Sequence, residues 1–89
     1  MKDQSFSIYH CEGVSFSGDI RNNCLSLTSE AWGGGFSSER HYTFTREETR
    51  KLFRIITLDQ FVKLCQKESL TGMEDFLREH DIDYSYVTI

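Results

Sequence analysis

The stretch HYTFTREETRKLFRII, residues 41–56, decides the fold because the spacing of its apolar residues changes at Thr45. Before this position Tyr42 and Phe44 alternate with polar residues, a period of two that indicates a strand with one buried face. After it the apolar residues recur every third and fourth position, as on one face of a helix. Thr45 and Glu48 have the spacing of a capping box, in which the threonine hydroxyl accepts from a free amide and the glutamate reaches back. Strands therefore precede this point and helices follow it, which predicts an α+β domain.

The segment before Thr45 keeps the strand period. Glu12-Gly13 predicts a tight turn or a bulge, and Arg21-Asn22-Asn23 predicts a hairpin turn because Asn tolerates positive φ. Gly33-Gly34-Gly35 interrupts the pattern and is typical of a connection between strands. Polar and apolar residues alternate in three segments, at residues 5–9, 14–17 and 24–28. The pattern predicts an N-terminal antiparallel β-meander of three to four strands.

The segment after Thr45 contains two more cap patterns, Thr57 with Gln60 and Thr71 with Glu74. Together the caps predict three short helices packed on one face of the sheet. Residues 84–89 are rich in aromatic and β-branched residues and predict a C-terminal strand. A chain of 89 residues builds one modest core, so residues 1–89 are expected to form a single domain. The helical stripes expected to face the sheet are Thr49, Leu52, Phe53, Ile56, Leu58, Phe61, Val62, Cys65, Met73, Phe76, Leu77 and His80.

The charge balance is acidic, with a formal net charge of −4. This balance disfavours binding to nucleic acid and suits a basic protein partner. Arg46, Arg50 and Arg54 share one face of the first predicted helix, which fits either a nucleic-acid surface or a solvated face. The acidic total favours the solvated face.

Cysteine usage and hydropathy indicate the cellular compartment in which the protein works. Cys11, Cys24 and Cys65 are odd in number and widely spaced, as expected for reduced thiols. The chain begins without an apolar leader and has no apolar run near the roughly 20 residues that span a bilayer. We therefore expect a cytoplasmic protein that does not act at a membrane.

The motifs of catalytic and metal chemistry do not match this sequence. The run Gly33-Gly34-Gly35 lacks the Lys and the helix start of a phosphate loop. The histidines and cysteines show no metal-ligand spacing. We therefore expect no metal, no cofactor, no small-molecule ligand and no enzymatic activity. An enzyme that uses Cys24 or Cys11 with a histidine is the alternative that spacing alone leaves open.

The residues expected to bind a protein partner are aromatic or acidic. Trp32 and Phe36 flank the glycine run, and exposed aromatics are typical of binding hot spots, although Trp32 fits equally well as a cap on the core. Carboxylates steer a basic partner toward its site, or serve only solubility. The other candidates are Asp19, Glu30, Glu39, Glu74, Asp75, Glu79, Asp81, Asp83, Tyr84 and Tyr86.

Three segments resemble the small bacterial immunity proteins that neutralise contact-dependent growth inhibition toxins. They are the hairpin at residues 17–27, His41-Tyr42-Thr43-Phe44-Thr45-Arg46-Glu47-Glu48-Thr49, and Asp81-Ile82-Asp83-Tyr84. The resemblance implies a cytoplasmic inhibitor that binds and occludes one cognate toxin domain, in many cases a basic nuclease. The alternative is a small regulatory or adaptor protein, of phage origin for example, that binds a host nuclease or transcription complex.

Overall fold

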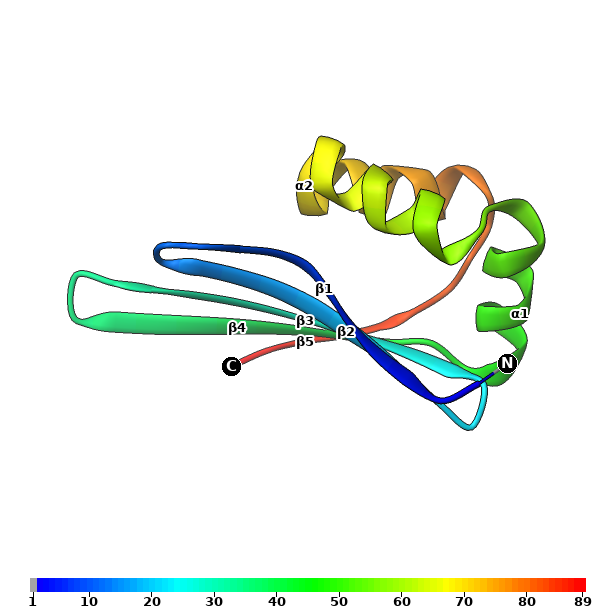
Figure 1. The fold of residues 1–89 in the computed structure, drawn as a ribbon, viewed down its shortest axis with the longest axis horizontal. Coiled ribbons are helices and arrows are strands. Elements are labelled where there is room, and N and C mark those ends of the chain that lie inside the picture. Colours follow the sequence, from blue (N-terminus) through cyan, green and yellow to red (C-terminus); the bar gives the residue numbers. More distant parts are fainter. Residues whose placement is uncertain (1) are drawn as a thin grey trace.

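The computed structural model describes residues 2–89, with the backbone alone for Phe36. Five strands form one antiparallel sheet in the order β1-β2-β3-β4-β5. Figure 1 shows both helices on the same side of this sheet. The predicted meander and C-terminal strand are confirmed, with four strands in the meander. The elements are β1 (Gln4–Cys11), β2 (Val14–Arg21), β3 (Cys24–Gly33), β4 (Phe36–Thr43), α1 (Arg46–Ile55), α2 (Leu58–Glu79) and β5 (Ser85–Thr88).

The predicted hairpin turn between β2 and β3 is confirmed. Asn22 and Asn23 have φ of 53° and 63°, the left-handed pair that a two-residue hairpin loop requires. At the other end of β2, Gly13 with φ of 85° closes the turn from β1, so Glu12-Gly13 is a turn rather than a bulge. The bulge of this hairpin lies instead in β1, between Ser7 and Tyr9.

The core lies between the sheet and the helices. Thr49 is 1% exposed, and its hydroxyl accepts from the backbone N–H of Leu25 at 3.0 Å, which ties α1 to β3. The rest of the predicted helical stripe is buried or half-buried, except for His80, which is exposed at the end of α2. The largest fully buried side chains of the core are Ile8, Phe16, Ile20, Leu25, Leu27, Tyr42, Leu52, Phe61, Met73 and Leu77.

The structure joins the second and third predicted helices, with only a break in the backbone between them. Residues 58–79 form one element, α2, which is interrupted at Ser69 with φ of 64° and ψ of −169°. Thr71, the third predicted cap, therefore lies inside α2. A straight helix of 22 residues would be about 33 Å long. Figure 1 shows instead that the second half of α2 returns toward α1, so the interruption reverses the chain.

The capping predictions for the other two helix starts have different outcomes. The Thr57 box is complete, because Gln60 donates its N–H to the Thr57 hydroxyl and accepts the Thr57 N–H in return. At Thr45 only the first half forms: the hydroxyl accepts from the N–H of Glu48, whose carboxylate turns elsewhere. Within residues 2–89 no helix is both long and apolar enough to cross a membrane.

Candidate partner-binding face

The sheet has one face covered by the helices and one uncovered face, which we call the open face (Figure 1). Along each strand the side chains alternate between the two faces of the sheet. The residues that lie between two buried residues of a strand are therefore on the open face. Cross-strand pairing then defines rows on it, since directly opposite residues share a face. One row runs through Ser15, Glu30, Glu39 and Ile89. Four of the predicted partner-binding residues lie on this face: Asp19, Glu30, Trp32 and Glu39.

Two carboxylates of the open face are direct cross-strand partners. Glu30 of β3 lies opposite Glu39 of β4. Like charges in this arrangement destabilise a sheet. The Oε2 atom of Glu39 is 2.9 Å from Nε2 of His41, which offsets part of the repulsion when the imidazole is protonated. The acidic pair therefore costs folding stability and offers a ready site for a basic group.

Exposed apolar side chains flank this acidic pair. Trp32, two residues beyond Glu30 on β3, is 44% exposed, so its interpretation as a buried cap on the core is wrong. On the other side, Ile89 lies beside Glu39 and is 75% exposed. Val87, on the same face of β5, is 56% exposed. Aromatic and aliphatic groups around a charged centre form the kind of surface that binding hot spots use.

The end of the open face away from Trp32 carries small hydroxyl side chains. They line a shallow trough of about 500 Å³ that also includes Asp19. Arg21 lies 3.8 Å from the Asp19 carboxylate and donates to the Ser5 hydroxyl at 3.2 Å. The alternating serines are visible in the sequence, but only the strand register shows that they form one surface. The hydroxyl residues of the trough are Ser5, Ser7, Ser17, Ser26 and Thr28.

The remaining predicted residues lie on a second surface, at the end of α2 and the approach to β5. Glu74 accepts a hydrogen bond from the Tyr42 hydroxyl at 3.0 Å, and burial together with this bond raises the pKa of Tyr42. Tyr84 and Tyr86 pack against Tyr42, with ring centroids 5.5 and 5.0 Å away. The exposed acidic residues here are Asp75, which pairs with Arg78, and Glu79, Asp81 and Asp83. The predicted set is therefore divided between two surfaces, and the Phe36 side chain lies outside the described residues.

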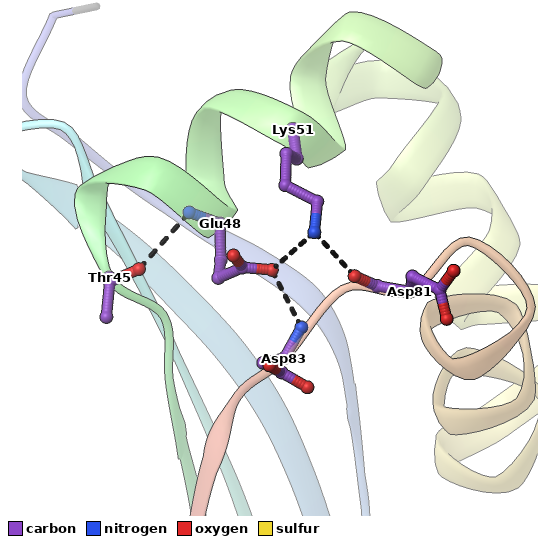
Figure 2. Close-up of polar contacts among 5 residues, drawn as sticks. All are labelled: Thr45, Glu48, Lys51, Asp81 and Asp83. Atoms are coloured by element: carbon purple, nitrogen blue, oxygen red, sulfur yellow. Dashed lines mark hydrogen bonds and ion pairs between the residues drawn. The ribbon is translucent and has the colours of Figure 1, made fainter.

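A clamp from α1 fixes the second surface, and Figure 2 shows its contacts. The Glu48 carboxylate accepts from the backbone N–H of Asp83 at 2.8 Å and pairs with Lys51 at 3.1 Å. Lys51 also donates to the backbone carbonyl of Asp81 at 2.6 Å. Asp81 has φ of 54°, so the chain turns sharply here, and its backbone rather than its carboxylate is held. Sequence reasoning missed this role because Glu48 fitted the capping pattern with Thr45.

The clamp makes stability depend on pH. The Asp83 hydrogen bond and then the Lys51 bond lower the pKa of Glu48 below its ordinary 4.5. A carboxyl whose folded pKa is lowered stabilises the fold above its unfolded pKa, and this contribution is lost as pH falls through the folded value. We expect Glu48→Gln to lower the unfolding free energy by about 1 kcal/mol at pH 7 and to flatten its fall below about pH 4.5. Urea titrations at several pH values measure both effects.

Glu47→Gln is the matched control for this prediction. Glu47 lies in the same first turn of α1 and is exposed, so its replacement removes the same charge from the same helix end. We expect it to change the unfolding free energy by less than about 0.5 kcal/mol. Equal losses in the two variants would show that the helix dipole, and not the clamp, accounts for the effect of Glu48.

Side chains that could together hold a metal ion do not gather in the part of the chain that the structure describes. Within residues 2–89 no three His, Cys, Asp or Glu side chains are placed to hold a metal ion. Cys65 lies in the core, where burial raises its pKa to about 12, so this thiol stays protonated at neutral pH. Comparison with known proteins finds no matching family model, no matching curated protein and no matching solved structure.

Proposed function

We propose that this protein is a toxin-neutralising immunity protein that binds a cognate toxin domain through its open face. The observation that carries the proposal is the acidic pair Glu30–Glu39 with Trp32 and Ile89 exposed on either side of it. In this proposal the protein acts in the cytoplasm as an inhibitor and not as an enzyme. The local resemblance to immunity proteins at residues 41–49 and 81–84 supports the same assignment.

The chemistry of the open face favours a basic partner. A nuclease domain binds an anionic substrate, so the surface around its active site carries positive charge. Glu30, Glu39 and Asp19 offer negative charge from one face of a rigid sheet, which complements such a surface and accelerates encounter. Trp32 supplies a large contact area with few rotatable bonds. Binding in this way occludes the toxin by covering the surface that its substrate needs.

An immunity gene is expected to follow the gene of its toxin, so the experiment pairs the protein with the domain encoded immediately upstream of its gene. We expect co-expression to restore growth that the toxin domain alone arrests, and the two purified proteins to elute together on size exclusion. The matched control is Glu79→Lys, a charge reversal on exposed α2 surface that should still rescue growth. Growth arrest in the presence of the folded protein, with no complex on size exclusion, would overturn the proposed function.

A further inference from the structure

The two edges of the sheet are not equally protected. At the β1 edge a bulge lies between Ser7 and Tyr9, and Gln66 of α2 donates to the backbone carbonyl of Ile8 at 2.7 Å. Bulges and covering side chains are how sheets prevent further pairing. At the opposite edge β5 pairs with β4, and no other described segment of residues 2–89 pairs with β5. The β5 edge is therefore the one open to a further strand.

The hydrogen bonds of β5 show which of its backbone groups are free to pair. Glu39 donates its N–H to the Ile89 carbonyl at 3.2 Å, and Ile89 donates to the Glu39 carbonyl at 2.9 Å. Backbone groups alternate in direction along an antiparallel strand, so Val87, like Ile89, faces β4. The N–H and C=O groups of Tyr86 and Thr88 consequently point outward, away from the sheet.

The side chains along this edge are uncharged, and three of them are exposed apolar or aromatic groups. Tyr86 is 44% exposed, and Val87 and Ile89 are exposed on the other face of the same segment. Residues 84–89 contain no charged side chain, although the whole chain has a formal net charge of −4. Two copies of an acidic protein repel each other over most of their surfaces, and this edge lets them approach without opposing charges.

We propose that β5 pairs antiparallel with β5 of a second copy of this chain, about a two-fold axis through Tyr86. Tyr86 then lies opposite Tyr86 of the second copy, and each donates its outward N–H to the other's carbonyl. Thr88 lies opposite Tyr84, and Asp83 opposite Ile89, so no two side-chain carboxylates face each other. The register buries the exposed Tyr86 ring against its copy, beside Tyr42.

The geometry of this pairing determines on which side of the dimer the helices and the open faces lie. The two-fold axis is perpendicular to the sheet, which is the only orientation that pairs the same strand antiparallel in one continuous sheet. The helices of both copies then lie on one side and the two open faces lie on the other, next to each other. This inference does not depend on the proposed function, since it rests on the free backbone groups of the sheet edge and not on Glu30, Glu39 or Trp32.

Disulfide trapping tests the register. In a background with Cys11→Ser and Cys24→Ser, Tyr86→Cys places two thiols at the axis, where Cα atoms of paired residues are about 5.5 Å apart, within disulfide range. Thr88→Cys is the matched control, because residue 88 is exposed on the same strand but lies about 13 Å from its copy. We expect a disulfide-linked dimer from Tyr86→Cys under mild oxidation and little from Thr88→Cys. Equal cross-linking at the two positions would overturn the register.

Sedimentation of the unmodified protein tests the dimer itself. We expect a concentration-dependent dimer, and Thr88→Pro should weaken it at least about tenfold because it removes a donor that points to the second copy. The N–H of Thr88 takes no part in the β4 ladder, so circular dichroism of this variant should be unchanged. A protein that stays monomeric at millimolar concentration, or a dimer unaffected by Thr88→Pro, would overturn the proposal.

Discussion

Replacing Glu30 with lysine is expected to weaken the proposed complex with a toxin domain by at least about 100-fold while making the free protein more stable. In the free protein the new lysine would lie opposite Glu39, and an opposite-charge pair replaces a like-charge pair, a gain of about 0.2–1 kcal/mol. In the proposed complex the same lysine would meet the basic surface expected of the toxin domain, and like-charge contacts across an interface cost several kcal/mol. The two effects have opposite signs, so a loss of binding cannot be attributed to unfolding.

The measurements are an equilibrium titration with the purified toxin domain and a urea denaturation of the free variant. Glu79→Lys makes the same change of charge outside the open face, and its affinity should stay within about threefold of the unmodified protein. The association rate of the unmodified protein should fall steeply with added salt, because exposed charges are screened over about 10 Å at 0.1 M. Unchanged affinity in Glu30→Lys would place the toxin-binding surface elsewhere.

Most of the architecture could be predicted from local pattern. The change of period at Thr45 separates sheet from helices, and Asn22-Asn23 specifies a hairpin turn by backbone preference alone. These features depend on residues a few positions apart, which a single sequence displays directly. The reversal inside α2 was predicted as a new helix start at Thr71, and the structure places the break at Ser69. Nothing about serine favours that backbone conformation, so tertiary packing must impose it.

The candidate site was predictable only as a set of residue types. Trp32, Glu30 and Glu39 were singled out by chemistry, but their common face depends on the register between β3 and β4. Val87 and Ile89 lie on the open face because β5 pairs with β4, which is a contact between distant parts of the chain. The acidic residues after Glu74 appeared similar to the others in sequence, and the fold places them on α2 and in the turn after it instead. Long-range pairing, which the sequence does not display, accounts for these differences.

The reversal in α2 can be tested by the effect of Gly72→Ala on stability, because a straight helix and the reversed chain predict effects of opposite sign. In a regular helix Gly72→Ala would stabilise the protein by about 1 kcal/mol, because alanine is the better helix former. In this structure a Cβ on Gly72 would clash with the Cβ of Glu68, which is fixed to the backbone and cannot rotate away. We therefore expect Gly72→Ala to destabilise the protein by about 2–4 kcal/mol, as overpacking at a constrained backbone position does.

Ser69→Gly tests the same reversal from the other direction. With φ of 64° and ψ of −169°, Ser69 lies in a backbone region used almost only by glycine, which costs about 1–3 kcal/mol for other residues. Glycine loses about 0.5–1 kcal/mol more conformational entropy on folding, so we expect a net gain of about 1 kcal/mol. Urea denaturation of both variants measures the effects, with Thr71→Ala, exposed in the same turn, as a control that should change the unfolding free energy by no more than about 0.7 kcal/mol. A stabilising Gly72→Ala with a destabilising Ser69→Gly would mean that α2 continues straight, and that Asp81 and Asp83 are not held against Lys51 and Glu48.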